Sequence, residues 1–447
     1  MGALLPDVGD TPQWAREARA CGELHPTVAS SRSSTRSAPR RPPASGGAGA
    51  DRLLTGVVLA LVSFGLVMVY STSSATALLS EGDPLGLVSR QAVYAVVGLG
   101  AYAVFARMSP EGMRRLGPPA LLVAGFLLLV VLAPSIGTQV NGSRRWISLG
   151  GLGQVQPSEI AKLALALWIA QAVVRRPARL RTPKGLAPVL LVTGALGLLI
   201  LLEPDMGTAV TLCAVAFSML VVAGARMRHL GTLMGAGACL AVMAILIEPY
   251  RRERLLAFLD PWSDPNGSGF QSVQAQVALG SGGLHGVGLG DGVQKAFYLP
   301  EAHTDMILAT VGEELGLIGV LAVLVAFGLF AVAGYRIALA ARDLHQQVLA
   351  AGLTTLVVVQ ASINIGAVVG VLPVTGVPLP FVSFGGSSLI TLLACSGLLV
   401  NIGRRSQRQA QRLAVVPPGE DRDRGRGDGR PRDAGPRRGR RVARAGG

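Results

Sequence analysis

Long apolar segments constrain the fold of this chain more than any other feature. Between its polar ends we count about ten segments of roughly 20 mostly apolar residues, the length that an α-helix needs to cross the hydrocarbon core of a bilayer. The segments begin near Leu53, Leu87, Pro118, Pro157, Leu186, Met206, Leu230, Asp305, Gln346 and Gly386. The sequence therefore predicts an all-α polytopic membrane protein, a bundle of about ten transmembrane helices.

The composition agrees with this class. Charged residues make up 15% of the chain, whereas soluble domains carry about 25%. The net charge of +15 is concentrated at the ends, since 14 arginines accompany five acids from Arg404 onward. Such a basic end can hold to anionic headgroups, and it does not indicate a nucleic-acid partner. The four cysteines are scattered and predict neither a disulfide framework nor a metal site. No cofactor is identified, and dependence on a divalent cation is left open.

The chain divides into three parts. Residues 1–52 and 404–447 are rich in Arg, Gly, Pro or Ser, so we expect two disordered tails that carry no chemistry. Residues 53–403 contain the predicted spans, with one long loop over 249–304 between the seventh and the eighth.

Basic residues set the orientation. They follow every even-numbered span, which by the positive-inside rule places both termini in the cytoplasm and the loop 249–304 outside. These residues are Arg107, Arg114, Arg115, Arg175, Arg176, Arg179, Arg181, Lys184, Arg226, Arg228, Arg336, Arg342, Arg404, Arg405 and Arg408.

An acidic segment, FYLPEAHTDMILATVGEELGLIG, opens the eighth span. Charge at the centre of a bilayer costs roughly 2.5–3.5 kcal/mol per residue, so these acids require a role. The orientation places Asp305 at the outer mouth of the span, and Glu313 and Glu314 about 12–13 Å deeper at about 1.5 Å per residue. We expect these two glutamates to face the bundle interior and pair with buried Lys or Arg.

Other outer segments supply complementary groups. NGSRRWISLG contains Arg144, Arg145 and Trp146, and QPSEIAK places Glu159 and Lys162 on one helical face. The segment LPVTGVPLPFVSFGGSSL between the last two spans carries no charge. Paired cations beside carboxylates suit a phosphorylated substrate, because cations hold phosphate while an acid performs proton chemistry.

Together with EPDMGTA, DPWSDPNGSGFQ, QKAFYLPEAHTD and GEELGLIG, these motifs resemble in order those of the SEDS family, the FtsW/RodA/SpoVE peptidoglycan polymerases, over residues 53–403. The resemblance implies a glycosyltransferase that links lipid II disaccharides into glycan strands. YLPEAHTD and INIGAVVGVLPVTGVPLPF look more like the division-type FtsW branch than the elongation-type RodA branch. Met306, Leu308 and Phe384 depart from the usual family residues but keep apolar bulk, and Glu203 replaces a common Gln without an assigned role.

The resemblance also implies a mechanism. The donor is a growing strand on undecaprenyl pyrophosphate, and lipid II is the acceptor. Asp305, the catalytic residue of the family motif, would take the proton from the acceptor 4-hydroxyl as it attacks the anomeric carbon, with inversion and no covalent enzyme intermediate. Arg144, Arg145 or Lys295 would balance charge on the departing pyrophosphate.

Further candidates complete the site. We expect substrate binding by Arg144, Arg145, Trp146, Glu159, Lys162, Lys295, Glu301, His303 and Ser387, and a supporting role for Glu313, Glu314 and Asn364.

Several alternatives stay open on the residues alone. Asp305 could serve as a helix-capping acid in the first turn of the eighth span, and Trp146 as an interfacial belt residue. The segment LGSGGLHGVGLGDG follows no strand of a βαβ unit, so we interpret it as flexible and not as a dinucleotide site. At the level of the whole chain, a lipid II flippase, a recruiting scaffold or a RodA-type elongation polymerase are the alternatives.

The resemblance implies partners and a location as well. A class B penicillin-binding protein would supply the crosslinking transpeptidase, alongside divisome proteins and membrane lipids. The chain is expected in the plasma membrane at the division septum.

Overall fold

The structure is a computed structural model that describes residues 49–80, 85–140, 143–148, 150, 153–175, 177–232, 234–235, 237, 243 and 249–415. Eight helices within these ranges are long and apolar enough to span a membrane. They are α2 (Ala50–Ser80), α3 (Gly86–Phe105), α4 (Pro110–Val131), α5 (Pro157–Arg175), α6 (Pro183–Leu202), α12 (Ile307–Ala340), α13 (Leu344–Val368) and α14 (Gly386–Val415).

The polytopic all-α prediction is confirmed for the described part of the chain. The apolar helix α7 (Met206–Val222) is shorter than the other spans and corresponds to the predicted sixth span. The predicted seventh span, from near Leu230, lies mostly outside the described residues. Most of the two predicted tails also lies outside them.

One tail boundary differs from the prediction. Residues 404–415 continue α14 as helix, although they were assigned to a disordered tail. Contacts with the neighbouring elements explain the extension. The Arg405 guanidinium donates to the Met108 carbonyl at 2.8 Å, and the Gln407 amide donates to the Asp51 carboxylate at 2.6 Å.

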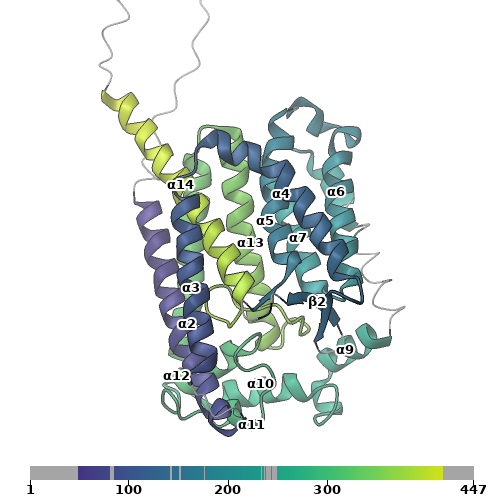
Figure 1. Cartoon of the computed structure of the whole chain (residues 1–447), viewed down its shortest axis with the longest axis vertical. Coiled ribbons are helices and arrows are strands. Elements are labelled where there is room, and N and C mark those ends of the chain that lie inside the picture. The colour runs from purple at the N-terminus through teal and green to yellow at the C-terminus, as the bar shows by residue number, and fades with distance from the viewer. Residues whose placement is uncertain are drawn as a thin grey trace, which may run out of the picture. The chain divides into compact units, whose positions relative to one another are not determined.

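The helices pack in two groups around α13 (Figure 1). Helices α2, α3, α12 and α14 pack on one another, and α4 packs against α5, with α6 and α7 next to them. Helix α13 contacts α5 and α7 on one side and α12 and α14 on the other. It is therefore the main element that joins the groups, with a smaller direct contact between α14 and α5. Helices α13 and α14 are the most buried spans.

The segment predicted as a long loop contains several helices. The segment 249–304 contains the helices α9 (Pro249–Leu259), α10 (Phe270–Ser281) and α11 (Gln294–Phe297), which lie across one end of the bundle (Figure 1). The 3₁₀ turn η4 (Pro261–Ser263) lies in the same segment, between α9 and α10, and a second one, η3 (Pro177–Arg181), links α5 to α6.

A small antiparallel sheet departs from the all-α expectation. Its strands, in the order β1 (Gly137–Val140), β2 (Ser143–Ser148) and β3 (Gln154–Val155), link α4 to α5.

Helix α12 opens at Gly316, where φ is 66° and ψ is −163°. This opening frees backbone groups that lie between apolar helices and must find partners. The Glu313 carbonyl accepts from the Val287 amide at 3.0 Å, and the Leu317 amide donates to the Gly283 carbonyl at 2.9 Å. The glycine-rich segment around these residues is thus docked on the kink, and our interpretation of it as flexible was wrong.

Gly316 is irreplaceable for two reasons. Its backbone angles lie in a region that is essentially restricted to glycine and costs other residues about 1–3 kcal/mol. A Cβ on Gly316 would also lie 2.4 Å from the Gly286 nitrogen and 2.5 Å from the Leu284 oxygen. The kink therefore requires glycine at position 316, and Gly282 and Gly286 of the docked segment also approach the α12 backbone too closely for a Cβ.

We predict that Gly316→Ala lowers the thermal unfolding midpoint of the detergent-purified protein by several degrees. Gly328→Ala on the same helix is the matched control, because a Cβ there meets nothing within 4 Å. It should leave the midpoint unchanged or raise it, since Ala is the better helix former. Equal midpoints for the two variants would contradict the proposed role of the kink.

Candidate active site

Asp305 lies in the turn that precedes α12. The N-cap of α12 is Met306, so Asp305 lies one residue before the cap and the helix has no acid in its first turn. The alternative in which Asp305 is an acid in the first turn of this helix is therefore wrong. The Asp305 side chain accepts from the Thr304 hydroxyl at 3.3 Å, and the residue is 9% exposed. Asp305 is thus nearly withdrawn from solvent, at the same end of the bundle as α9, α10 and α11.

Helix α13 holds the Asp305 turn. The Asn364 amide donates to the Asp305 carbonyl at 2.7 Å and to the Val377 carbonyl at 2.8 Å. One helical turn earlier, Gln360 accepts from the Lys162 ammonium at 2.9 Å. Because residues four apart on a helix are neighbours, α13 connects the Asp305 turn with the Glu159–Lys162 pair.

The Glu159–Lys162 pair is buried between α5 and α13. The Lys162 ammonium lies 2.9 Å from Glu159 Oε1, and both side chains are at most 2% exposed. The predicted spacing of three residues on one helical face is confirmed by this ion pair. Its burial means that the pair fixes α5 against Gln360 of α13 and does not line an open surface.

The uncharged segment between α13 and α14 packs against the Asp305 turn. The Phe384 amide donates to the His303 carbonyl at 2.9 Å, and the two rings meet edge to face with centroids 5.8 Å apart. Burial lowers the pKa of the His303 imidazole, and nearby Glu301 opposes the shift. His303 is therefore uncharged at neutral pH, and it contributes packing against Phe384 and not a positive charge.

Two residues of these turns have left-handed backbone angles. Glu301 has φ of 56° and Phe381 has φ of 65°. Non-glycine residues in this region cost about 1–3 kcal/mol and cluster at functional sites. The Glu301 carboxylate accepts from the Thr304 hydroxyl at 2.8 Å, so the same hydroxyl contacts both acids of the turn.

A second chain of contacts joins α14, α5 and α7. The Ser387 hydroxyl accepts from the Gln156 amide at 3.1 Å, and the Gln156 side chain donates to Asp205 at 3.2 Å. Asp205 caps α7 by accepting from the Thr208 amide at 3.0 Å. Sequence reasoning missed Gln156, Asp205 and Gln360. The first two lie in the motifs QPSEIAK and EPDMGTA, where the signal was available.

Strand β2 carries the two arginines of the predicted site. Side chains alternate along a strand, so Arg144 and Trp146 share one face and Arg145 lies on the other. Arg145 Nε donates to the Glu203 carbonyl at 3.0 Å, and its Nη2 donates to the Pro204 carbonyl. Both contacts are to neutral carbonyls, so the charge of the Arg145 guanidinium is not balanced by an acid in these bonds.

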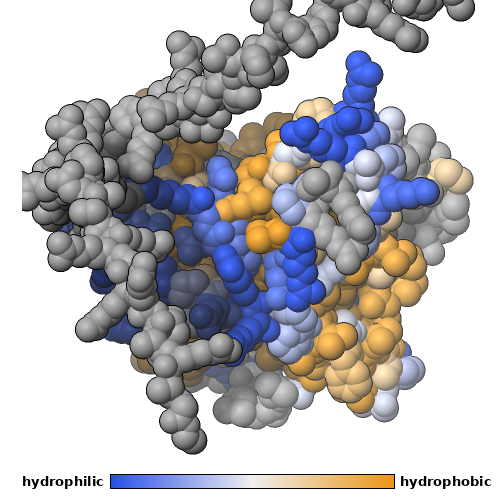
Figure 2. All heavy atoms as spheres, turned by 90° about the horizontal axis from the view of Figure 1, so that it is seen from above, coloured by the Kyte–Doolittle hydropathy of each residue, from blue (hydrophilic) through white to orange (hydrophobic). Residues whose placement is uncertain are grey.

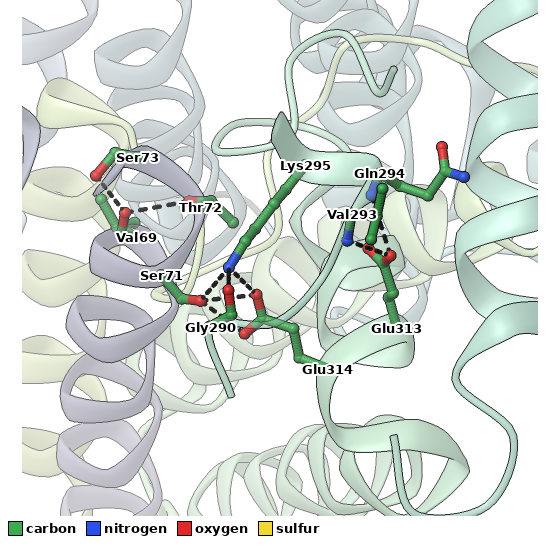
Figure 3. Close-up of polar contacts among 10 residues, drawn as sticks. All are labelled: Val69, Ser71, Thr72, Ser73, Gly290, Val293, Gln294, Lys295, Glu313 and Glu314. Atoms are coloured by element: carbon green, nitrogen blue, oxygen red, sulfur yellow. Dashed lines mark hydrogen bonds and ion pairs between the residues drawn. The ribbon is translucent and has the colours of Figure 1, made fainter. Parts of the chain in front are cut away.

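The environment of Lys295 differs from that of the two arginines, because Lys295 is buried and paired with an acid (Figure 3). Its ammonium lies 2.6 Å from Glu314 Oε1, 3.0 Å from the Ser71 hydroxyl and 2.6 Å from the Gly290 carbonyl. These contacts use all three donors of a lysine, and the side chain is 2% exposed. Lys295 therefore anchors the outer segment to α2 and α12, which leaves it no donor for a pyrophosphate.

Glu313 and Glu314 both hold this segment, through different partners (Figure 3). Glu314 pairs with a buried lysine, as expected. Glu313 instead accepts from the backbone amides of Val293 at 2.7 Å and Gln294 at 3.0 Å, at the start of α11. The deep acids of the eighth span thus attach the outer segment to the kink of α12.

Glu203 is a buried acid in the turn between α6 and α7. It is 0% exposed, and neither carboxylate oxygen accepts a hydrogen bond from the residues that the structure describes. Burial, reinforced by the nearby charge of Asp205 and opposed by Arg145, raises the pKa of Glu203 to about 8. At neutral pH the side chain is mostly a neutral acid, which resembles a glutamine in charge and shape.

Comparison with known proteins identifies the class. A sequence profile of the FtsW/RodA/SpoVE family, described as cell cycle protein, matches residues 51–408. A probable peptidoglycan glycosyltransferase FtsW from Geobacter metallireducens is 41% identical over 79% of this chain and 95% of that protein. Another from Thioalkalivibrio sulfidiphilus is 44% identical over 80% of this chain and 90% of that protein. Stage V sporulation protein E of Bacillus subtilis is 40% identical over 80% and 98% of the two chains.

Solved structures support the same family. A chain from a peptidoglycan synthase complex that coordinates polymerization and crosslinking superposes with a TM-score of 0.65, at 33% identity over 79% of this chain and 97% of that chain. The rod shape determining protein RodA of Thermus thermophilus gives a TM-score of 0.58, at 30% identity over 78% of this chain and 95% of that chain. The protein is thus a polytopic membrane protein with a buried polar site at one end. It belongs to the FtsW/RodA/SpoVE family, and its FtsW-named relatives support the division-type branch.

We predict that Glu203→Gln changes the pH dependence of stability. The raised pKa of Glu203 means that the folded protein holds a proton which the unfolded chain releases above about 4.5. This contribution to stability is present below pH 4.5 and is lost as the pH rises through about 8. The variant should therefore unfold at a higher temperature than the wild type at pH 9, with a smaller difference at pH 6.

The matched control is Glu111→Gln, which makes the same chemical change at an 81% exposed side chain. Unfolding midpoints at pH 6 and pH 9 should shift alike for this variant and the wild type. Parallel pH profiles for Glu203→Gln and the wild type would contradict the proposed protonation of Glu203.

Proposed function

We propose that this chain is a peptidoglycan glycosyltransferase that polymerises lipid II into β-1,4-linked glycan strands. The reaction would transfer the growing strand from undecaprenyl pyrophosphate to the 4-hydroxyl of lipid II. Family membership and the names of the relatives support the activity. The observation that carries the assignment of the site is the Asp305 carboxylate, nearly buried at the outer end and held by contacts from α13.

Asp305 is the proposed general base. It would accept the proton of the acceptor hydroxyl as the oxygen attacks the anomeric carbon and the bond to the pyrophosphate breaks. A single displacement converts an α-linked pyrophosphate into a β-linked glycan. Asn364 is a positioning residue in this scheme, because it fixes the backbone of Asp305 and of the facing segment at once. Such fixation keeps the base at the reacting position.

Arg145 or Arg144 is the proposed cation for the leaving pyrophosphate. Lys162 and Lys295 are each paired with a buried carboxylate, so their charge is already compensated. Arg145 makes two hydrogen bonds to backbone carbonyls, and an arginine has five N–H donors. It would therefore keep donors for phosphate oxygens while its backbone contacts hold it in place, and Arg144 and Trp146 would contact the substrate from the other face of β2.

The role in the cell that we propose is septal wall synthesis. The FtsW-named relatives support a division role over a RodA-type elongation role. The positive-inside pattern supports an orientation with Asp305 outside and both termini in the cytoplasm of the plasma membrane.

The proposed partner is a class B penicillin-binding protein. The similar chain from a synthase complex that couples polymerization to crosslinking supports it. Such a partner should co-purify with the protein from native membranes in mild detergent. Its repeated absence from intact preparations would count against the partner, although not against the polymerase.

The decisive experiment replaces Asp305 by Asn. Asparagine keeps the size of the side chain and can still accept the Thr304 hydrogen bond, but it cannot carry away a proton. General-base assistance is typically worth about 10²–10⁴-fold, so polymerisation by Asp305→Asn should fall by that order while folding and lipid II binding persist. The measurement is glycan product from purified protein supplied with lipid II on its outer face, which a flippase or a scaffold would not polymerise.

Glu301→Gln is the control. It removes a neighbouring charge four residues away and keeps the acceptor of the Thr304 hydroxyl, so it should cost much less activity. The activities of the two variants are compared only if their thermal unfolding midpoints are similar. A near-normal rate for Asp305→Asn would refute the mechanism.

A further inference from the structure

The end of the bundle opposite Asp305 contains a cavity that the proposed reaction does not use. It has a volume of about 530 Å³ and lies between the last turns of α14 and the turn that joins α3 to α4. No Asp or Glu is among the described residues that line it. Its lining includes five arginines: Arg107, Arg404, Arg405, Arg408 and Arg412. Figure 2 views this end of the bundle and shows hydrophilic residues gathered on it, beside hydrophobic residues.

Helix geometry explains why the arginines converge. Arg404, Arg408 and Arg412 are spaced by four residues, so they lie along one face of α14. Like charges at this spacing repel one another and destabilise the helix. Arg107 adds a further positive charge from the turn after α3. An anion in the cavity would relieve this repulsion.

Some of these side chains already have partners, and others do not. Arg405 donates to Asn401 at 2.6 Å and to the Met108 carbonyl at 2.8 Å, which fixes α14 to the turn after α3. Arg404 Nε lies 3.8 Å from Asp51. Arg408 and Arg412 are exposed and make no hydrogen bond or ion pair with the residues that the structure describes. Both residues line the cavity, so their N–H donors are available to a ligand bound there.

Two simpler explanations do not account for the cluster. The helix dipole favours cations only in the last turn, which in α14 contains Arg412 alone. The positive-inside rule explains basic residues at this end. It does not require that residues from two separate elements line one cavity.

The apolar surface beside the cavity indicates the kind of ligand. Val93, Val97 and Val104 on α3 are 59%, 51% and 63% exposed. Their helical spacing places them along one face of α3, and the C-terminal end of α3 leads into the turn that carries Arg107. A molecule with a phosphate in the cavity and acyl chains along this surface would satisfy both regions.

We propose that this cavity is a binding site for the phosphate of an anionic phospholipid headgroup. Planar guanidinium groups bind phosphate oxygens in pairs, and basic pockets between transmembrane helices are suited to anionic headgroups. The site lies at the end of the bundle opposite Asp305, and it is independent of the glycosyltransferase assignment, because its test measures lipid binding and not polymerisation.

The test uses the purified full-length protein in neutral detergent, titrated with phosphatidylglycerol or phosphatidylcholine while thermal unfolding is followed. Phosphatidylglycerol should raise the unfolding midpoint, and phosphatidylcholine should not. In the double variant Arg408→Gln/Arg412→Gln, the half-saturating concentration of phosphatidylglycerol should rise about 30-fold, roughly fivefold for each cation near an anionic lipid. Arg408→Gln alone should raise the half-saturating concentration about fivefold. This single variant tests the proposal if the double variant is too unstable to measure.

Three comparisons decide the result. Arg226→Gln/Arg228→Gln removes the same charge from exposed residues after α7, and it should leave the half-saturating concentration unchanged. An equal loss there would overturn the proposal in favour of general surface charge. An equal rise with inorganic phosphate alone would assign the site to a soluble phosphate. Loss of the rise on deletion of residues 416–447 would assign lipid binding to that segment and not to the cavity.

Discussion

Within the apolar bundle every opened backbone bond and every buried charge must find a partner in the protein. At the kink of α12 this requirement organises the end of the bundle that carries Asp305. At Gly316 the helix opens, and its freed backbone groups pair with the glycine-rich segment. Glu313 holds the start of α11 and Glu314 holds Lys295, so two buried acids attach the same segment. Removing one partner of such a buried pair leaves an uncompensated charge, which typically costs about 3–5 kcal/mol.

Helix α13 holds two parts of the candidate site in place. Its polar residues Gln360 and Asn364 lie one turn apart on an otherwise apolar span, and each contacts a different part of the outer end. The first meets the buried Glu159–Lys162 pair, and the second meets the Asp305 turn. Helix α13 thus places the carboxylate proposed as the base through the backbone of its turn, and the Thr304 hydroxyl donates to the side chain itself. Rigid placement of this kind is what catalysis by positioning requires.

The basic residues divide into two groups by their surroundings. Lys162 and Lys295 are buried and paired with carboxylates, so they stabilise the fold. Arginines at the two ends of the bundle keep unused donors. Arg145 holds backbone carbonyls near the proposed site, and Arg408 and Arg412 line the cavity at the other end. Arginine suits both places, because its charge is permanent and its planar donors match phosphate oxygens.

The sequence by itself determined the class of the protein, because apolar segments of membrane-spanning length leave few alternatives to a helical bundle, and it singled out Asp305 through an ordered set of motifs. It also indicated that Glu314 needs a buried basic partner. Only the tertiary structure decided that this partner is Lys295, that Asp305 precedes the N-cap of α12, and that the glycine-rich segment is docked on the kink. The difference has a physical reason. Hydrophobicity and local spacing act within one segment and can be read along the chain. The pairing of buried polar groups joins residues far apart in sequence, such as Ser71 and Glu314, and depends on how the helices pack.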